Sequence, residues 1–586
     1  MSRCLINFTL IFLIIFGAMN TIGFAQELDS SQIEKGSTQP ITAEEENSEE
    51  LKGKTTKEMQ TVPVWFLVVF LISGAIFFTF WYGFINIKMF RHSIEIIRGK
   101  YDNPEDKGDI SHFKALTSAL SATVGLGNIA GVAVAIQLGG PGAVFWMTIA
   151  ALFGMTAKFS SCALGQYYRK VNIDGSISGG PMYYLDLGFK EKGPVWGIFG
   201  KILAFLFAIF LMGGAVGAGN MFQANQSYAA VYDTFLKDDA NYVSPTPQIE
   251  NNKINEEKTL LQKVNGSFFS ILLGDIAFGS VQVEKVERVK DIQKAAKVPN
   301  EVEQKRKQRY SLIFGLVLAG LVGLVIIGGV KRIGSATSKI VPIMCGMYVI
   351  ASLYIIITNF TGIPDAFMLI IRMAFTENAA YGGTIGVLMW GLRRAVFSNE
   401  AGLGSASIIH AAAKTKEPIR EGIVAMIGPF IDTIIICNMT ALVVILTGAW
   451  DNPSIPDKAG VELTTFAFKS AISWFPVVLS VCIVLFAYSS MISWCYYGER
   501  GWIYVLDHFG ENFGIKSVIA FRLVFVGFVV LGTVSHLSDV LDFSDALLLS
   551  MAFPNIIGGI VLAPKILEKT RDYVRRYRAG EFKTYS

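Results

Sequence analysis

Long apolar segments alternate with short polar ones along most of this chain. A run of roughly 18 or more apolar residues is long enough to cross a lipid bilayer as a helix. From residue 62 onward, the pattern predicts about eleven transmembrane helices. Their expected ranges are 62–86, 111–138, 142–168, 197–231, 310–328, 338–359, 382–411, 418–448, 473–498, 516–534 and 539–564. The chain is therefore predicted to be an all-α polytopic membrane protein.

Two of these apolar segments are interrupted by the same Gly-Leu-Gly sequence. The first interruption lies within residues 121–131 and the second within residues 396–405. Irregular backbone at bilayer depth is tolerated only where it is buried in protein or lines a cavity. Two such breaks in two halves of one chain indicate a secondary transporter with a binding site near the midplane. Close helix packing through small residues is the alternative for the glycines alone, but the neighbouring polar side chains favour a site.

The breaks offer two kinds of backbone group to a ligand. Free N–H groups at a half-helix start suit a carboxylate, and unwound carbonyls suit a dehydrated cation. An amino-acid zwitterion with a sodium ion matches both. Gly125 and Gly127 would let the backbone approach the substrate, and Thr123 and Asn128 would add side-chain oxygens. At the second break, Ser398 and its neighbours would serve the substrate amine or a gate.

Four charged residues lie in or beside the second half of the apolar pattern. Asp432 falls deep in an apolar segment, while Arg393, Arg394 and Glu400 flank the second break. Such charges act in ion coordination, in a proton relay or as a gate. The structural alternative is a buried salt bridge between Glu400 and Arg393 or Arg394, since buried charges usually pair.

Two further polar clusters interrupt apolar helices. Asn220, Gln223 and Asn225 fall within one of them, and a run of serines ends at Trp494 in another. Ser490 and Trp494 are four residues apart, so they share a helix face. This arrangement favours a cation site beside the wall of a substrate pocket, although a serine in a membrane helix often bonds only to its own turn.

The first residues resemble a processing signal. A positive start, an apolar core and a small-residue cleavage site predict a signal peptide over residues 1–25. A polar, disordered exported tail is expected over residues 26–61. Residues 233–309 form a second polar stretch, predicted to be an exported insert that is either a partly ordered loop or a small partner-binding module.

Basic residues are concentrated in alternate loops and in the tail after residue 564. This bias predicts an exported N-terminus and a cytoplasmic C-terminus in a bacterial inner membrane, in agreement with the signal peptide. The residues that carry it are Lys88, Arg91, Arg98, Lys100, Arg169, Lys170, Lys190, Lys331, Arg332, Lys339, Lys414, Lys416, Arg420 and the basic tail 565–586.

Composition narrows the class of protein. Hydrophobic residues make up 52% of the chain and charged residues 17%, whereas soluble domains carry roughly 25% charged residues. No nucleophile–base pair of an enzyme is recognisable. The six cysteines and five histidines are scattered, without the spacing of a disulfide framework or metal site. The composition does not indicate a nucleic acid as a partner. A channel or receptor is less consistent with two breaks inside one chain.

Seven motifs in order resemble the alanine/glycine:cation symporter family, also called sodium:alanine symporters. They are Gly125-Leu-Gly-Asn-Ile-Ala-Gly-Val-Ala133, Gly139-Gly-Pro-Gly-Ala-Val-Phe-Trp-Met147, Gly179-Gly-Pro-Met-Tyr-Tyr184, Gly219-Asn-Met-Phe-Gln-Ala-Asn225, Phe397-Ser-Asn-Glu-Ala-Gly-Leu-Gly-Ser-Ala406, Gly428-Pro-Phe-Ile-Asp432 and Tyr496-Tyr-Gly-Glu-Arg500. The resemblance implies an inverted five-plus-five repeat like that of the neurotransmitter:sodium symporters, within the APC superfamily. Repeat one would cover 111–359 and repeat two 382–564, after an extra leading helix at 62–86.

The resemblance also implies a function and a set of site residues. It implies sodium-coupled import of alanine or glycine by alternating access, with Na⁺ as the coupling ion and no organic cofactor. Proton coupling through Asp432 or Glu400 is the alternative. By similarity, Thr123 and the Leu126 and Gly127 amides would meet the substrate carboxylate, while Gln223 and Trp494 would line the pocket. The sodium residues would be Ser121, Val124, Phe486, Ser489 and Ser490.

One departure from the family concerns the first break. The family usually has Gly-Thr-Gly-Asn where this chain has Gly125-Leu-Gly-Asn128. The hydroxyl is lost at Leu126, so the side-chain contacts to substrate are expected to differ there.

Overall fold

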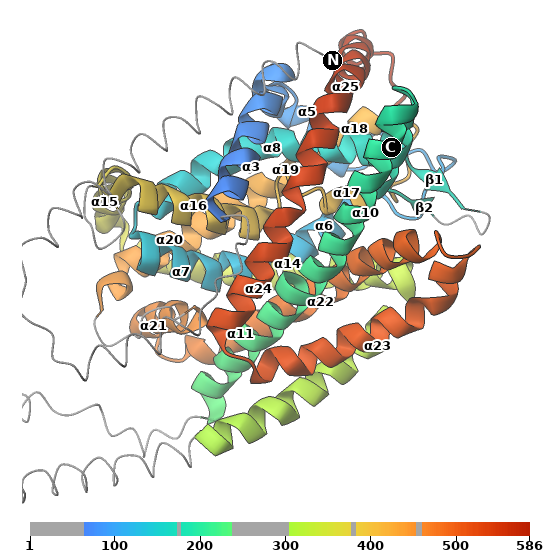
Figure 1. Cartoon of the computed structure of the whole chain (residues 1–586). Coiled ribbons are helices and arrows are strands. Elements are labelled where there is room, and N and C mark those ends of the chain that lie inside the picture. Colours follow the sequence, from blue (N-terminus) through green and yellow to red (C-terminus); the bar gives the residue numbers. More distant parts are fainter. Residues whose placement is uncertain (1–63, 173–176, 237–303, 377–382, 453–459, 586) are drawn as a thin grey trace, which may run out of the picture. The chain divides into compact units, whose positions relative to one another are not determined.

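The computed structural model describes residues 64–172, 177–236, 304–376, 383–452 and 460–585 (Figure 1). The chain divides into two compact units, one formed by residues 231–313 and the other by the remainder. The packing described below concerns the larger unit. The expected signal peptide and exported tail (1–61) lie outside the described residues, and so does most of the expected insert.

The described residues are mostly helical, which agrees with the all-α prediction. The only sheet in the described ranges is one antiparallel pair of two-residue strands, β1 and β2, in which Lys170 pairs with Ser178 and Val171 with Ile177. The first half has α3 (Val64–Trp81), α4 (Ile85–Lys88), α5 (Phe90–Ile97), α6 (His112–Thr123), η1 (Leu126–Asn128), α7 (Ala130–Gly139), α8 (Ala143–Tyr167), β1 (Lys170–Val171), β2 (Ile177–Ser178), α9 (Pro181–Lys190), α10 (Pro194–Val216), η2 (Gly217–Met221), α11 (Phe222–Val231), η3 (Tyr232–Leu236), α14 (Gly329–Thr358), η5 (Phe360–Gly362) and α15 (Ile363–Ala374). The second half has α16 (Gly383–Asn399), α17 (Ala406–His410), α18 (Pro418–Ala425), α19 (Ile427–Pro429), η7 (Phe430–Cys437), α20 (Asn438–Leu446), η8 (Ala449–Asp451), α21 (Val461–Ala471), α22 (Phe475–Leu506), α23 (Phe513–Val534), α24 (Leu537–Ser550) and α25 (Ala552–Arg578).

Eight helical stretches in the described part of the chain are long and apolar enough to cross a membrane. They are Ala143–Tyr167, Pro194–Leu236, Gln304–Ile326, Gly329–Thr358, Pro418–Leu446, Phe475–Leu506, Phe513–Val534 and Leu537–Arg578. A ninth is the bent pair His112–Thr123 and Leu126–Gly139. The two other expected segments, 62–86 and 382–411, contain α3 and α16, and α16 has 17 residues. The multi-pass membrane class is therefore supported, while the count of eleven spans and the inverted repeat stay predictions.

Two long helices organise the packing of this unit. α8 packs against α3, α16, α17 and α18, whereas α22 packs against α6, α10, α14 and α23. Both broken segments are thus held against a straight helix, α6 by α22 and α16 by α8. Large apolar side chains on α14 and α23 point outward; Ile350 is 70% exposed and Leu523 is 67% exposed. Such side chains suit contact with lipid tails rather than water.

Two short π-helical segments interrupt otherwise regular membrane helices. η2 follows α10 and contains the buried Asn220, and η7 lies between α19 and α20 and contains the buried Asp432. A π segment redirects the side chains after it and frees backbone carbonyls, and it occurs frequently at functional sites. Both segments carry polar side chains that the sequence pattern singles out.

Candidate functional site

The first break opens the backbone between α6 and α7. The two helical pieces are bent by 58° relative to each other. The Gly125 N–H donates to Asn128 Oδ1 at 3.0 Å, and the Leu126 N–H donates to Gln223 Oε1 at 3.2 Å. The N–H groups at the break therefore face side-chain oxygens, the kind of acceptor that a carboxylate would replace.

The second break separates α16 from α17. Glu400 has a left-handed backbone with φ +55°, and Gly402 and Gly404 follow with φ +86° and +88°. Left-handed conformations are natural for glycine but cost energy at a glutamate, and such strain often accompanies function. The Glu400 carboxylate accepts a hydrogen bond from the Ser405 hydroxyl and also interacts with the Trp494 side chain.

The two breaks are in direct contact with each other. Asn128 Nδ2 donates to Ser398 Oγ at 3.2 Å. A Cβ atom at Gly127 would lie only 3.3 Å from Cα of Ser398, so the absence of a side chain permits this approach. Polar residues from both Gly-Leu-Gly motifs therefore form one cluster in the folded chain.

Asp432 of η7 joins the two breaks through its carboxylate. Oδ1 accepts from Asn128 Nδ2, and Oδ2 accepts from Ser398 Oγ at 3.0 Å and from Thr433 Oγ1 at 3.2 Å. Asp432 is fully buried. In the described part of the chain, no basic side chain lies within 4.0 Å of this carboxylate, and the buried Lys158 acts on it electrostatically from a greater distance.

The alternative prediction of a salt bridge between Glu400 and Arg393 or Arg394 is wrong. Arg393 and Arg394 both bind Asp545 of α24 instead, with Arg393 Nε 2.6 Å from Asp545 Oδ2. Glu400 lies beyond the end of α16, where its left-handed backbone directs the side chain toward Ser405. Because Asp545 is more than 140 residues away in sequence, local spacing gave no sign of it.

The predicted sodium residues lie together where α6 meets α22. Ser121 Oγ donates to the Ser489 carbonyl at 2.7 Å, and Ser490 Oγ donates to the Ser121 carbonyl at 3.0 Å. Ser489 Oγ donates to the Phe486 carbonyl at 3.0 Å. Val124 follows at the end of α6, where ψ of 84° takes the backbone out of the helical region. The cluster contains oxygen ligands of the kind that alkali cations use.

Predicted substrate residues differ in how closely they approach the first break. Gln223 reaches it directly, as described above. Trp494 Nε1 donates to the Ala122 carbonyl at 3.3 Å, and a Cβ atom at Gly219 would lie 2.2 Å from the Trp494 ring. The Thr123 hydroxyl instead bonds to carbonyls of its own helix, those of Ala119 and Leu120.

Several residues of this cluster were not predicted as site residues. Lys158 is buried and donates to the Asn399 carbonyl at 3.1 Å, and Asn399 Nδ2 donates to Thr433 Oγ1 at 2.9 Å. Thr440 Oγ1 donates to the Asn128 carbonyl at 2.9 Å. A lysine inside an apolar segment was the available signal for Lys158. Thr433 and Thr440 gave no sequence signal of a site, because threonine is common in membrane helices.

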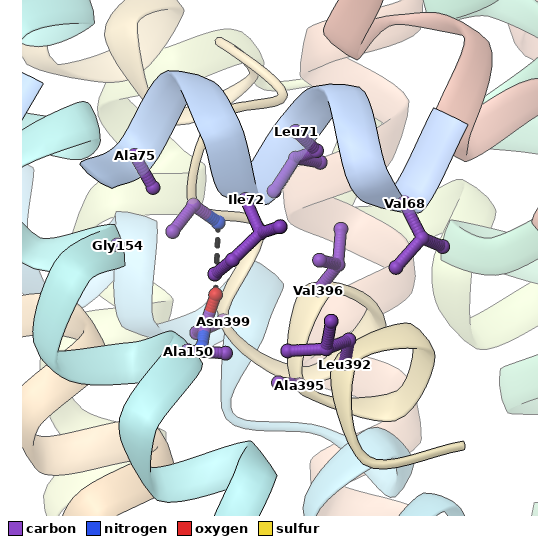
Figure 2. A pocket seen from close by; sticks show the side chains of 11 residues that line it. Val68, Leu71, Ile72, Ala75, Ala150, Gly154, Leu392, Ala395, Val396 and Asn399 are labelled. Atoms are coloured by element: carbon purple, nitrogen blue, oxygen red, sulfur yellow. Dashed lines mark hydrogen bonds between the residues drawn. The ribbon is translucent and has the colours of Figure 1, made fainter. Parts of the chain in front are cut away.

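A small pocket beside the second break is apolar (Figure 2). It lies between α3, α8 and α16 and is lined by Leu71, Ile72, Ala150, Val396 and Asn399, among others. The polar Asn399 Oδ1 already accepts the Ala401 N–H at 2.9 Å. An amino-acid zwitterion would find no free charge partner there, so the polar contact of the two breaks is the better candidate site.

Comparison with known proteins agrees with the resemblance indicated by the sequence motifs. The model of the sodium:alanine symporter family matches residues 49–244 and 255–586. An uncharacterized transporter of Haemophilus influenzae is 36% identical over 88% of this chain and 94% of its own length. The sodium/alanine symporter AgcS of Methanococcus maripaludis is 35% identical over 87% and 95%. The probable sodium/glutamine symporter GlnT of Bacillus subtilis is 29% identical over 88% and 89%.

Proposed function

Because the chain belongs to the sodium:alanine symporter family, we propose that it imports alanine or glycine together with Na⁺. The family and the relatives are transporters and not enzymes. The observation that carries the proposal is the contact of the two helix breaks at Asp432. It gathers backbone N–H groups, amides, hydroxyls and one carboxylate, the groups needed to bind both ends of a zwitterion.

The substrate carboxylate would bind at the first break. The Leu126 N–H, which now donates to Gln223 Oε1, would turn to the carboxylate, with the Gly127 N–H beside it. Gln223 would then present its amide N–H₂ to the same carboxylate by rotating about its last torsion. Thr123 and Asn128 complete the proposed set on this side, although Thr123 must first leave its own helix turn.

The substrate amine would lie toward the second break. Ser398 Oγ and the Asp432 carboxylate are the acceptors that support this placement. Trp494 would form the wall of the pocket on the α22 side. A bulky wall close to the backbone would limit the substrate side chain to a hydrogen or a methyl group, as in glycine or alanine. Glu400, which contacts Ser405, would act as a gate.

Sodium would bind between α6 and α22. Carbonyl oxygens of Ser121, Val124 and Phe486 and hydroxyl oxygens of Ser489 and Ser490 form the proposed set. Their present hydrogen bonds to one another support it, because an ion would replace those donors at the same oxygens. Sodium bound at Ser121 stiffens α6 close to the carboxylate site, which would couple the two ligands.

Transport would follow alternating access between two halves. We place the N-terminus outside and the C-terminus in the cytoplasm of a bacterial inner membrane, with inverted repeats at 111–359 and 382–564 that rock around the site. One inward positive charge gains about 2.3 kcal/mol per 100 mV of membrane potential. That corresponds to roughly fortyfold accumulation of the neutral substrate.

Proton coupling is the second candidate. Asp432 and Glu400 are both buried, and no basic side chain in the described ranges lies within 4.0 Å of either carboxylate. The buried Lys158 acts on both carboxylates only electrostatically, from beyond that distance, and a buried carboxylate with no cation in contact is able to carry a proton. A proton on Glu400 would leave the proposed substrate contacts unchanged, whereas a proton on Asp432 would alter an acceptor of the substrate amine.

Binding of labelled alanine to the purified protein tests the proposal before transport is measured. We expect saturable binding in NaCl that is lost in KCl and is displaced by excess unlabelled alanine or glycine. Binding of equal strength in both salts would remove sodium from the site. No binding in either salt would reject alanine as the substrate.

A further inference from the structure

A cluster of titratable side chains lies at the ends of α6 and α17 that face away from the breaks. Glu421 of α18 is fully buried, and each of its carboxylate oxygens faces a histidine. Oε1 lies 2.6 Å from His410 Nδ1, and Oε2 is hydrogen-bonded to His112 Nδ1. His112 begins α6 and His410 ends α17. One carboxylate therefore ties together the outer ends of both broken segments.

The backbone holds the same two ends together. The Asp109 N–H donates to the Ala412 carbonyl at 2.8 Å, and the Lys414 N–H donates to the Ile110 carbonyl at 2.8 Å. Arg169 Nη1 donates to the carbonyls of Ala411 and Ala413. The segment before the first break and the segment after the second break are thus clamped to each other.

The ring nitrogens offer His112 Nε2 as the position where an additional proton would face an acceptor. Both Nδ1 atoms must carry hydrogen to bond a charged Glu421, so each Nε2 of a neutral ring is left as an acceptor. Both Nε2 atoms are buried without a hydrogen-bond partner. His112 Nε2 lies 3.8 Å from Asp102 Oδ1, which is also buried and unpartnered. A proton on His112 Nε2 would create a donor that faces this acceptor.

Asp102 connects the cluster to solvent. Its side chain is 38% exposed, so protons can reach it from the aqueous side. It lies in the loop before α6, outside the spanning helices. Partial burial raises the pKa of the Asp102 carboxyl, while the charge of His112 works against that rise.

The other charged and titratable groups around the cluster each have hydrogen-bond or charge partners. Arg169 and the Cys162 thiol interact with Glu421 from α8 and the residues after it. Arg420, next to Glu421, interacts with Asp102 and donates to the Tyr101 carbonyl and to Tyr573 of α25. From α5, His92 bonds to Tyr573 and interacts with Arg420, and burial lowers the pKa of His92 to about 4. His92 therefore stays neutral between pH 5.5 and 7.5.

We propose that Asp102, His112, Glu421 and His410 form a proton-binding site on the cytoplasmic side that locks the two broken segments together. A proton on His112 completes a chain from Asp102 through His112 and Glu421 to His410, in which the charged ring faces Glu421 at Nδ1 and Asp102 at Nε2. The locked state resists the separation of α6 from α17 that release to the cytoplasm requires. This inference rests on the proposed function and orientation, and the bound proton acts as an inhibitor and not as the coupling ion.

Nitrogen NMR of the protein labelled with ¹⁵N-histidine in lipid bilayers tests the site without transport. The chain has five histidines, so the spectrum is simple. Between pH 7.5 and 5.5, we expect the imidazole signal that is missing from His112→Gln to become imidazolium in wild type. If the signal removed by His112→Gln stays neutral down to pH 5.5, the proposal is rejected.

Uptake into proteoliposomes with buffered interiors tests whether proton binding at this site slows transport. Lowering the internal pH from 7.5 to 5.5 at constant external pH should slow sodium-driven alanine uptake about fivefold or more, an ordinary coupling between sites. Glutamine at position 112 still donates to Glu421 but does not titrate, so His112→Gln should abolish the response. His508→Gln, at a histidine bonded only to the Tyr504 carbonyl of its own turn, should retain it.

Each result separates this inference from the proposed function. Absence of uptake by wild type at any pH rejects the proposed function, and the NMR result then decides the site alone. Uptake with the same internal pH dependence in wild type and His112→Gln rejects the lock. If His112→Gln fails to fold, Asp102→Asn removes the negative charge that the new proton would face, at a half-exposed position, and should weaken the response in the same direction.

Discussion

Asn128 and Ser398, one from each helix break, are hydrogen-bonded at 3.2 Å and share the carboxylate of Asp432. They are 270 residues apart in the chain. Because each lies where a membrane helix loses its regular backbone, movement of one break must disturb the other. This relationship makes the pair of breaks a single site and gives Asp432 a central position in it.

Asp432→Asn tests whether the Asp432 carboxylate is central to transport. Asparagine keeps the shape but removes the charge and one of the two acceptor oxygens. A hydrogen bond to a charged group contributes about 1.5–3 kcal/mol, so alanine uptake should fall about tenfold to hundredfold. Asp365→Asn, at an exposed aspartate, is the matched control and should leave uptake unchanged. Full uptake by Asp432→Asn would separate Asp432 from the transport cycle.

Gly125→Ala tests the close packing at the first break. A Cβ atom there would lie 2.5 Å from Ser490 Oγ and 3.2 Å from Gln223 Oε1, in the space between the proposed sodium and substrate residues. We expect uptake to be lost while the protein still inserts and elutes as a single species. Gly346→Ala, at a helical glycine with open space around it, should transport normally. Equal uptake by the two variants would place the ligands elsewhere.

Ser490→Ala tests the sodium residues. Loss of one oxygen ligand worth about 1.4 kcal/mol would raise the half-saturating sodium concentration about tenfold. The maximal rate at saturating sodium should change much less. Ser550→Ala removes a hydroxyl that bonds only to the Ala546 carbonyl of its own helix, so its sodium dependence should match wild type. An unchanged sodium requirement in Ser490→Ala would exclude this hydroxyl as a ligand.

Asp545→Asn and Glu400→Gln distinguish the two assignments of the arginine pair. Removing one partner of a buried ion pair costs about 3–5 kcal/mol. Asp545→Asn should therefore lower the unfolding temperature of the purified protein markedly, since Arg394 loses its paired carboxylate and Arg393 keeps only the exposed Asp542 at 3.8 Å. Glu400→Gln should change it little. A larger loss of stability in Glu400→Gln would mean that the arginines depend on Glu400 after all.

The sequence allowed the breaks and most of the candidate site to be predicted, because those signals are local. Glycine beside Asn128 or Ser398 inside an apolar run is unusual wherever the partner helix lies. The serines of α22 were predicted for the same reason. Polar residues at bilayer depth need partners, so several of them gather in one cluster once the helices pack.

Partners chosen by tertiary packing were not predictable. Arg393 and Arg394 precede Glu400 by two turns or less, yet the left-handed turn at Glu400 and the approach of α24 give them Asp545 instead. His112, His410 and Glu421 are scattered in sequence and meet only because the ends of both broken segments converge.

Uptake of labelled alanine into proteoliposomes tests the central claim most directly. Vesicles with equal membrane potential would be given an inward sodium gradient, an inward proton gradient or neither. We predict accumulation only with the sodium gradient and its loss in Asp432→Asn. Uptake that is indifferent to sodium would contradict the claim, and uptake driven by the proton gradient alone would identify the protein as a proton-coupled transporter.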